Sequence, residues 1–415
     1  MCFKLILFVL LIFAQSLFSA THLVPSVYPT IQEGIDAALE GDTVLVAPGT
    51  YTSIGNSDIT FNGVNLVLLS ASGAESTIID IGSELYGIIF ENGEDTTSQV
   101  NGFSFRNGTY SIFMTTGIAN VLNCSFETSQ VGIFLEYPTG ISSCRISHCR
   151  LQNNSGGIYN LKYGTLIDSC TIQNNSNYGI GMYAPTDIRY CLVANNAWVG
   201  IMQSSGMNHY PVLVDHCTVV SNGYGIYFDR TLPLPPDKEV MVVDTSLIIN
   251  TVVAFNDSYG IYNYWDLEAE YNCVYSNVYG NGTNWQNDKY SHGDVFGNVS
   301  IDPLFCDTAT GDFTLKDNSY CTDGNNPSGS TIGVYDVGCT GGCCIGIRGN
   351  VDNSPDDIID IGDLVYFVDW FFSGGPHLAC PPEGDLNVDT FFDIADLVYL
   401  VSYMFADGPE PLPCP

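Results

Sequence analysis

Basic residues are scarce in this chain of 415 residues: Lys and Arg together number 11, against 45 Asp and Glu. The formal net charge is therefore −34 at pH 7. A field of this sign repels polyanions, so nucleic acid, pectate and anionic membranes are not expected as partners held by ion pairing.

Charged residues of both signs are also few, at 13% of the chain, whereas apolar residues make up 45%. A disordered acidic chain has the opposite balance, so the protein is expected to fold around a core. Stretches without Gly or Asn that are long enough for a helix are rare. This favours many short strands over bundled helices.

The chain has one apolar run at its start, Leu5 to Phe13, which follows Lys4 and precedes the small residues Ser19 and Ala20. This order is typical of a secretory signal, and we predict a signal peptide over residues 1–20. The run is too short to span a bilayer comfortably. We therefore expect a secreted, extracellular or cell-surface protein with no membrane span after signal cleavage.

The 15 cysteines form two main groups. The first recurs in the middle of the chain: Cys124, Cys149, Cys170, Cys191, Cys217 and Cys273. The second crowds the last quarter: Cys306, Cys321, Cys339, Cys343, Cys344, Cys380 and Cys414. In an exported chain the second group predicts disulfide bonds, whose pairing the sequence leaves open.

The middle of the chain repeats with a period of roughly 21 to 26 residues. Successive units read NCSFETSQVGIF, HCRLQNNSGGIY, SCTIQNNSNYGI, YCLVANNAWVGI and HCTVVSNGYGIY. Apolar residues stand two places after each Cys and three places before it. The first spacing keeps one strand face, whereas the second breaks parity and predicts a corner.

These units fit a coil of three short strands per turn, with neighbouring turns about 4.8 Å apart. The Cys column is expected to pack in the interior rather than to do redox or metal chemistry. One turn position predicts a ladder of side-chain amides: Asn154, Asn175, Asn196 and Asn222.

The segment VPSVYPTIQEGIDAALEGDTVLVAPGTYT, residues 24–52, closely resembles the opening of right-handed parallel β-helix proteins of the pectin-lyase-like group. The resemblance implies an all-β fold, a right-handed parallel β-helix solenoid, which we place at residues 21–324. Thr30 and Glu33 predict a capping box for a helix that stops at Gly41 and caps the first turn. The fold hosts lyases, hydrolases, epimerases and binding proteins, so it implies no single activity.

Asp168, Arg189 and Asp215 occupy one repeat position on consecutive turns. A stack of acid, base and acid could deprotonate a sugar ring, which makes these three the candidate catalytic residues. The alternative is an ion-pair ladder that neutralises itself. The chain lacks the combined signatures of family members that hydrolyse polygalacturonate, which disfavours pectinolytic activity.

Aromatic residues often follow the recurring Gly-Ile pair and predict an external stripe: Phe113, Phe134, Tyr159, Tyr227 and Tyr262, interrupted by Met202. Such rings stack on sugars, although they also stabilise cross-strand packing by themselves. The candidate substrate-binding residues are Phe134, Tyr159, Tyr227, Tyr262 and, at the corner beside Asp215, His216. The segment 231–239 is expected to bulge from the coil as a loop.

The end of the chain carries two copies of an acidic unit, each followed by an apolar helical pattern. The second copy spaces oxygen ligands as a twelve-residue Ca²⁺ loop does: Asp385, Asn387, Asp389, Phe391 through its carbonyl, Asp393 and Asp396. The first copy ends in Asp360 and Asp363. Its first ligands depend on how the loop is counted back from this end. Without a gap they are Asp352, Ser354 and Asp356. With a two-residue insertion they are Asn350 and Asp352.

Each following helix has apolar residues at i, i+3, i+4 and i+7, which predicts that the two helices pack through them: Ile361, Leu364, Val365, Val368, and Ile394, Leu397, Val398, Val401. Phe367, Trp370, Leu400 and Tyr403 lie partly off this stripe and are either a docking patch or core.

This pair resembles a type I dockerin, a duplicated Ca²⁺-binding module that docks onto cohesin domains. We place it at residues 347–415, after a linker at 325–346 rich in Cys, Gly and Asn. Thr390 and Asp357 depart from the family, which has Gly at the sixth loop position.

Two function classes follow. In the first, a secreted β-helix recognises polysaccharide and is anchored or assembled through its Ca²⁺-dependent module, with a cohesin-like partner. In the second, the β-helix is a polysaccharide lyase, glycoside hydrolase or epimerase.

Overall fold

The structure, a computed structural model, describes residues 19–52, 54–136, 144–205, 211–230, 246–263, 271–286, 296–340, 347–352, 354, 358–373, 378, 381–388 and 393–413. Within these ranges no helix combines the length and the apolar character that crossing a membrane requires. The chain divides into two compact units, residues 1–188 with 194–210 and residues 189–193 with 211–415, and each is described by itself.

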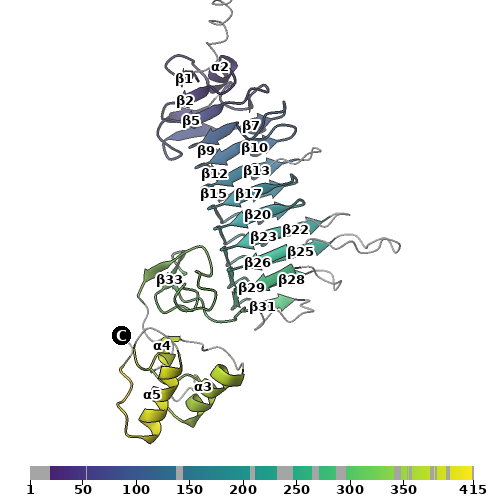
Figure 1. Cartoon of the computed structure of the whole chain (residues 1–415). Helices are drawn as coiled ribbons and strands as arrows, with labels where there is room; N and C mark the ends of the chain where they lie inside the picture. Colours follow the sequence, from purple (N-terminus) through teal and green to yellow (C-terminus); the bar gives the residue numbers. More distant parts are fainter. Residues whose placement is uncertain are drawn as a thin grey trace, which may run out of the picture. The chain divides into compact units, whose positions relative to one another are not determined.

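Three parallel sheets form a right-handed β-helix of about eleven turns, as predicted. Figure 1 shows their strands as a ladder of arrows. Sheet A has eleven strands: β1 (Thr21–Val24), β2 (Thr43–Val46), β5 (Val67–Ser70), β8 (Gln99–Asn101), β11 (Asn120–Leu122), β14 (Arg145–Ser147), β17 (Thr165–Asp168), β20 (Thr186–Arg189), β23 (Val212–Asp215), β26 (Ser246–Ile249) and β29 (Tyr271–Val274).

Sheets B and C have ten strands each. Sheet B contains β3 (Gly49–Tyr51), β6 (Thr77–Asp80), β9 (Ser104–Arg106), β12 (Ser125–Glu127), β15 (Arg150–Gln152), β18 (Thr171–Gln173), β21 (Leu192–Ala194), β24 (Thr218–Val220), β27 (Val252–Ala254) and β30 (Asn277–Tyr279). Sheet C contains β4 (Ile59–Thr60), β7 (Tyr86–Phe90), β10 (Tyr110–Met114), β13 (Val131–Leu135), β16 (Gly156–Asn160), β19 (Tyr178–Met182), β22 (Val199–Ser205), β25 (Tyr224–Arg230), β28 (Tyr259–Asn263) and β31 (Thr283–Gln286).

The apolar columns read from the repeats are in register. In the first unit Val121 pairs with Ile146 in sheet A, and Phe126 pairs with Leu151 in sheet B. All four side chains are fully buried. The prediction of stacked core columns is confirmed.

The predicted corner between sheets A and B is made by one residue with positive φ. His148 has φ 54° and Ser169 has φ 54°, and each directly precedes a Cys of the repeat. A residue in the left-handed region turns the chain sharply, and this explains why the parity breaks there. Two residues separate each strand of sheet A from the next strand of sheet B, from β8 to β30.

The cysteines of the repeat are buried thiols. The Cys149 thiol lies between those of Cys124 and Cys170, and burial raises its pKa well above the ordinary value. The prediction that Cys273 belongs to this column is wrong. Cys273 is in register with Ile248 within sheet A, and Ser276 stands at the position after the corner. Interior packing is therefore the role of this column.

The predicted amide ladder forms along the turn after sheet B. Asn175 Oδ1 accepts from Asn154 N at 3.0 Å, and Asn175 Nδ2 donates to Asn196 Oδ1 at 2.8 Å. In the second unit Asn222 Nδ2 donates to Asn256 Oδ1 at 3.0 Å, and Asn256 Nδ2 to Asn281 Oδ1 at 2.8 Å. The ladder thus continues beyond the residues that the sequence identified.

The glycine of the recurring Gly-Ile pair is required by close approach. A Cβ on Gly157 would lie 2.4 Å from the backbone oxygen of Gly179 in the next turn. Because that oxygen belongs to the sheet backbone, a larger side chain would force two turns apart.

Connections from sheet C back to sheet A vary in length, in contrast to the uniform corner between sheets A and B. Residues 231–245 separate β25 from β26, whereas residues 264–270 separate β28 from β29. The predicted loop at 231–239 lies in the first of these connections, outside the described residues.

The first helix, α2 (Ile31–Asp36), begins where the sequence predicts it. Thr30 Oγ1 accepts from Glu33 N at 3.2 Å, which is half of the predicted capping box. The helix ends at Asp36 rather than at Gly41, because Ala37 already caps it. Its buried residues Ile31 and Ile35 place it against the first strands; that it protects the end of the coil stays a prediction.

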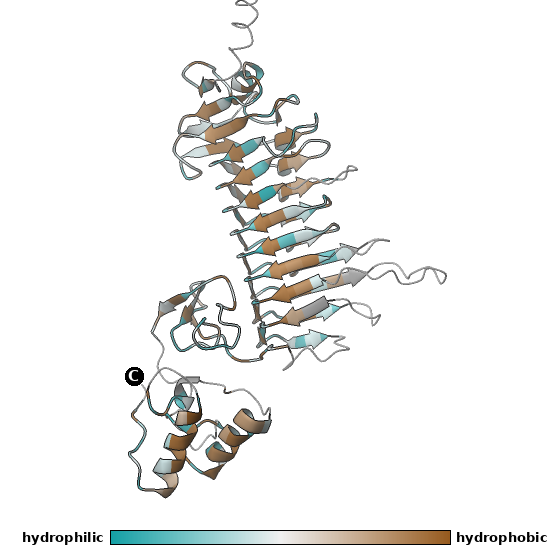
Figure 2. Cartoon of the chain, viewed as in Figure 1, coloured by the Kyte–Doolittle hydropathy of each residue, from teal (hydrophilic) through white to brown (hydrophobic). Residues whose placement is uncertain are grey.

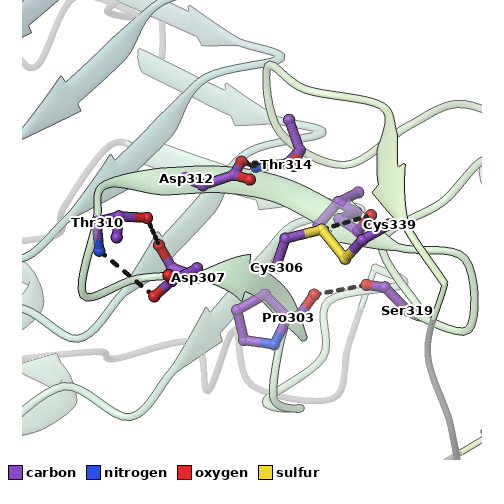
Figure 3. Close-up of a disulfide and its surroundings, with 9 residues drawn as sticks. Pro303, Cys306, Asp307, Thr310, Asp312, Thr314, Ser319 and Cys339 are labelled. Carbon is purple, nitrogen blue, oxygen red and sulfur yellow. Dashed lines mark hydrogen bonds between the residues drawn. A yellow bond between two sulfur atoms is a disulfide. The ribbon is translucent and has the colours of Figure 1, made fainter.

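A small sheet follows the coil, made of β32 (Phe305–Asp307), β33 (Asp312–Lys316) and β34 (Val337–Cys339). Cys306 and Cys339 form a disulfide across it (Figure 3). Cys321 was also predicted to form a disulfide; it is instead a buried free thiol, which accepts from Asn277 Nδ2 at 3.2 Å. Cys343, Cys344, Cys380 and Cys414 lie outside the described residues.

The segment predicted as a linker, 325–346, is folded in its described part. It contains β34 and the fully buried Ile332, whose N–H donates to the backbone oxygen of Cys321 at 2.8 Å. Residues 341–346 lie outside the described residues.

The C-terminal region, which we call the tail (residues 347–413), contains α3 (Ile361–Ser373), α4 (Pro381–Gly384) and α5 (Ile394–Phe405). Its core is small: Val351, Phe367, Leu378, Leu386, Leu397 and Leu400. Phe367 and Leu400, which the sequence left open between docking patch and core, are core; Trp370 and Tyr403 are partly exposed.

The apolar stripe predicted to join the two helices is mostly exposed, which corrects the sequence interpretation. Val365 and Val398 are each 62% exposed, and four equivalent residues are also exposed: Ile361, Val368, Ile394 and Val401. Figure 2 shows why the pattern misled, since both helices are apolar over most of their length. Each helix therefore has two apolar faces, and the core is formed by the faces that contain Phe367 and Leu400.

Candidate functional site

A polar group lies on the outer face of sheet A in the first unit, where Asp168 ends β17. Arg145 and Ser147 come from the neighbouring strand β14, and Ser147 is in register with Asp168. Arg145 Nη2 and Ser147 Oγ donate to Asp168 Oδ2, the hydroxyl at 3.2 Å. Ser169 Oγ donates to Asp168 Oδ1, also at 3.2 Å. Both carboxylate oxygens are therefore engaged.

This environment keeps Asp168 ionised. Burial opposes its ionisation, but the hydrogen bond and charge of Arg145 outweigh burial and hold the Asp168 pKa below its ordinary value. A general acid needs a raised pKa, so Asp168 is unsuited to that role. The sequence interpretation missed Arg145, although its position two residues before Ser147 places both on one strand face.

Arg189 and Asp215, the other two predicted catalytic residues, end β20 and β23 and belong to the second unit. Asp215 Oδ1 lies 2.6 Å from His216 Nδ1, so its close partner is the imidazole at the next position. His216 forms the corner after β23, with φ 49°, and its Nε2 lies 2.7 Å from Ser330 Oγ. Ser330 lies 114 residues further along the chain, where no repeat pattern could predict the contact.

Aromatic side chains stack along the outer face of sheet C in the first unit. Phe113 is in register with Phe134, and Phe134 with Tyr159. Their ring centroids are 5.4 and 5.0 Å apart. We call this set the aromatic ridge; its partly exposed members are Tyr86, Tyr110, Phe113, Phe134, Tyr159, Tyr178 and Tyr183. The predicted stripe therefore forms in this unit.

The sequence interpretation missed half of the ridge. Tyr86 and Tyr110 form a second column three residues earlier in their strands, with stacked rings 5.7 Å apart. The signal was the residue before Gly-Ile, which is Tyr in several repeats. Gly181 is a further interruption besides Met202: a Cβ there would lie 3.2 Å from the Tyr159 ring and 3.5 Å from Met202 Cε, so both side chains lean over it.

The second unit repeats the arrangement with tyrosines. Tyr227 and Tyr262 stack at 5.0 Å, and Tyr224 and Tyr259 stack at 5.6 Å. Because the rings stack on one another, the outer face presents ring edges and hydroxyls. In the first unit, burial raises the pKa of Tyr178 to about 12 and also raises that of Tyr159, so both phenols stay protonated and can donate hydrogen bonds.

The second acidic loop of the tail is organised by its last carboxylate. Asp396 Oδ1 accepts from Leu386 N at 2.8 Å and from Asn387 N at 3.3 Å, and Asp396 Oδ2 accepts from Asp393 N at 2.9 Å. Asp396 is fully buried, and burial raises its pKa to about 6. Asp385 and Asn387 belong to the same loop, whereas Asp389 and Phe391 lie outside the described residues.

The first loop shows the same pattern and answers the question of its register. Asp363 Oδ1 accepts from Val351 N at 2.7 Å and from Asp352 N at 3.1 Å, and Asp363 Oδ2 accepts from Asp360 N at 2.7 Å. Val351 and Asp352 are therefore equivalent to Leu386 and Asn387 in the second loop. This equivalence selects the two-residue insertion, with Asn350 and Asp352 as the first two ligand positions.

The donor set of the first loop consists of oxygens, which suits Ca²⁺. Asp352 Oδ2 and Asp360 Oδ1 lie 2.5 and 2.9 Å from the point where a Cβ on Gly362 would stand, so two carboxylates converge there. Among the described residues no group of three or more acidic, His or Cys side chains is close enough to hold a metal. Asp356, a predicted ligand, lies outside them.

The comparisons with known proteins agree with this fold. A sequence profile of the family described as the right-handed beta helix region matches residues 42–232. Pectate lyase Pel9A superposes with a TM-score of 0.54 at 14% identity, over 78% of this chain and 98% of that chain. The A-module of mannuronan C-5 epimerase AlgE6 from Azotobacter vinelandii gives 0.46 at 15% identity, over 61% and 72%. No curated protein matches the sequence.

At 14% identity the likeness to the pectate lyase shows the fold alone. The activity of that enzyme rests on its own side chains, and the same fold hosts several unrelated activities. Function in this chain must therefore be argued from the residues described above.

Proposed function

We propose that this protein is secreted and binds a neutral polysaccharide along sheet C, and that its tail binds Ca²⁺ and docks onto a cohesin-like protein. The aromatic ridge carries the glycan part of the proposal. Partly exposed aromatic edges and phenol donors on successive turns repeat at the spacing of the coil, which suits a repeating ligand. A neutral glycan is favoured because the net charge of −34 repels polyuronates.

Binding is tested by electrophoresis of the full chain through gels that contain neutral glycans or polyuronates. We expect retardation by a neutral glycan, and about tenfold weaker binding for Tyr159→Ala, in line with the loss of one aromatic contact. Phe134→Ala, Tyr227→Ala and Tyr262→Ala should act in the same direction. The matched control is Tyr275→Asn, which removes a 37% exposed ring from a corner outside sheet C.

Equal binding by Tyr159→Ala and by the wild type would show that the ridge serves packing alone. Retardation by polyuronates only would contradict the electrostatic argument.

The duplicated tail loops support the Ca²⁺ part. When bound, the ion would supply positive charge to the converging carboxylates. Asn350, Asp352, Asp360 and Asp363 would hold it in the first loop, and Asp385, Asn387, Asp389, Asp393 and Asp396 in the second. Calorimetric titration of the full chain should show binding that Asp352→Ala weakens. Asp369→Ala is the control, because this exposed acid lies on α3, outside the loops.

The exposed apolar stripes support the docking part. Ile361, Val365 and Val368 on α3 have equivalents in Ile394, Val398 and Val401 on α5, so the tail presents two similar faces. Large exposed apolar surface marks interaction sites. Since either face could serve alone, we expect Val365→Asp or Val398→Asp to leave binding to a cohesin domain nearly intact and the double variant to abolish it. A double variant that still binds would exclude both faces.

The second candidate function is a carbohydrate-active enzyme that uses Asp168, Arg189 and Asp215. The ionised, fully engaged Asp168 carboxylate argues against it as an acid and leaves only a role as a base. Incubation with a panel of uronate and neutral glycans tests it: new reducing ends or unsaturated products that vanish in an Asp168→Ala, Asp215→Ala double variant would establish this function over the first.

A further inference from the structure

Three side chains of the second unit form a chain of two short contacts. Asp215 Oδ1 lies 2.6 Å from His216 Nδ1, and His216 Nε2 lies 2.7 Å from Ser330 Oγ. Carboxylate, imidazole and hydroxyl in this order form the arrangement in which histidine deprotonates a serine. We infer that Ser330, His216 and Asp215 form a nucleophilic triad that hydrolyses esters of small, neutral acyl groups.

The contacts around the imidazole define its tautomer. Nδ1 carries the proton, because the Asp215 carboxylate can only accept there. Nε2 then has its lone pair free to accept the Ser330 hydroxyl proton. Asn250 Nδ2 lies 3.4 Å from the same Nε2, which agrees with a ring nitrogen that accepts. The structure thus favours the tautomer that a general base requires.

Neighbouring groups hold the imidazole in place. The Tyr190 ring stacks on it with centroids 5.0 Å apart and planes inclined by 25°. The side chains of His216 and Asp215 are only 17% and 18% exposed, so their interaction is partly shielded from water. A fixed, shielded imidazole is a better base than a mobile one.

The loop that carries Ser330 is held by hydrogen bonds within the loop and by one to the coil. Ser330 O accepts from Asn326 Nδ2 at 3.0 Å, and Ser330 N donates to Ser328 Oγ at 3.2 Å. Three residues later, Gly333 N donates to the backbone oxygen of Asn250 at 2.8 Å. Ser330 itself is partly exposed, so a substrate can reach its hydroxyl. The nucleophile is therefore positioned before substrate binds.

The reaction balances without a cofactor. Ser330 Oγ attacks the ester carbonyl carbon while its proton moves to His216 Nε2, which gives a tetrahedral intermediate. The bond to the alcohol oxygen breaks as His216 returns the proton to that oxygen. Water, deprotonated by His216, then attacks the acyl group on Ser330; the carboxylic acid leaves and the serine is restored.

The substrate class follows from charge and access. The net charge of −34 disfavours anionic esters, and a serine that is only partly exposed favours a small acyl group such as acetate. This inference does not rest on glycan binding by the aromatic ridge, so the failure of either leaves the other standing.

A serine-directed fluorophosphonate probe tests the triad on the full chain, with the modified residue identified by peptide mass spectrometry. We expect the adduct on Ser330, its absence in Ser330→Ala, and labelling at least about 100-fold slower in His216→Asn, the loss typical of removing a general base. Asn is chosen because it tolerates the positive φ at this corner. Hydrolysis of p-nitrophenyl acetate should fall in parallel.

Thr331→Val is the matched control, because it removes the next hydroxyl of the same loop, which donates to Asp336 Oδ1 at 2.9 Å. It should label at the wild-type rate. A folded wild type with no adduct on Ser330, or a labelling rate that His216→Asn leaves unchanged, overturns the proposal and reduces the contact to one that pins the loop.

The Ser330→Cys variant gives a second readout. The free cysteines of the described residues are all buried, and peptide mass spectrometry distinguishes alkylation at residue 330 from alkylation of cysteines outside the described residues. With His216 as base, its alkylation at neutral pH should be at least about tenfold faster than in Ser330→Cys combined with His216→Asn. Equal rates in the two variants would also overturn the triad.

Discussion

The coil and the tail bury polar groups in opposite ways. In the coil, each buried Asn of the ladder forms hydrogen bonds with the neighbouring turns, and these bonds offset the cost of burying its amide. In the tail, Asp363 and Asp396 are buried, and the bonds that the described residues make to them come from the N–H groups of their own loops. The comparison teaches that repetition stabilises the coil, whereas the tail depends on a few residues and, in our proposal, on Ca²⁺ bound in its loops.

The largest effect is expected in the small core of the tail. Phe367→Ala should destabilise the tail by about 3–5 kcal/mol, because Phe367 is fully buried among five other core residues. The helical circular-dichroism signal should melt at lower temperature while the coil is unchanged. Phe372→Ala is the control, since Phe372 is 69% exposed. Equal melting of both variants would mean that the core of the tail lies elsewhere.

A break in the amide ladder should cost the coil somewhat less. Asn175→Ala leaves the buried Asn154 N–H and Leu151 oxygen without their side-chain partner, at about 2–4 kcal/mol in the free energy of unfolding. Calorimetry of the full chain measures this loss. Gln173→Ala, on the outer face of β18, should change stability by no more than about 0.5 kcal/mol. An unaffected Asn175→Ala variant would refute a stabilising ladder.

Substitution of one glycine in each region should have different effects on the coil and on the tail. Gly157→Ala should lower the stability of the coil by about 1–3 kcal/mol, because the new Cβ meets a backbone oxygen that cannot move. Gly362→Ala places its Cβ against the carboxylates of Asp352 and Asp360, which can swing away. It should therefore weaken Ca²⁺ binding, measured by calorimetric titration, with little loss of stability. The reverse outcome would contradict the comparison.

The last prediction concerns the pH dependence of stability and a buried amine in the coil. Lys162 is 3% exposed, its Nζ donates to the backbone oxygens of Thr115 and Gly117, and burial lowers its pKa from 10.5 to about 8. Between these values the unfolded chain binds the proton and the folded chain does not, so this residue makes stability rise with pH. Below about pH 8 the penalty is complete and constant.

Lys162→Met isolates this contribution from other groups that titrate in the same range. Its unfolding free energy, followed by urea titration at several pH values, should lack the part of the rise that the wild type shows between pH 8 and 10.5. Parallel curves for the two proteins would mean that Lys162 titrates normally.

Periodicity predicted the coil well because each column is a local pattern repeated in register. Val121, Ile146 and Ile167 could be aligned by their distance from a Cys, and the structure pairs them. Cys273 was misplaced because its repeat carries Ser276 at the position where five earlier repeats carry Cys. Residues outside the pattern were beyond reach: Ser330 meets His216 only because the chain folds back on the coil after β33.

In the tail, the sequence predicted the positions of the loops but not the packing of the helices. Ligand spacing located both loops, but the register of the first needed the matching bonds to Asp363 and Asp396. Helix spacing chose the wrong stripe, because Val365 and Phe367 are both apolar and the pattern alone does not rank them. Burial of the larger aromatic side chain decides the packing.

Each turn from β8 onward has a corner of constant length between sheets A and B and a connection of variable length between sheets C and A. The constant corner, with its two residues and positive φ, keeps the turns in register, and β26 stays in register with β23 although residues 231–245 separate it from β25. Extra sequence can therefore be added to a turn between sheets C and A, so the coil offers a row of graft points for reporters, one per turn, that leave the hydrogen bonding between turns intact.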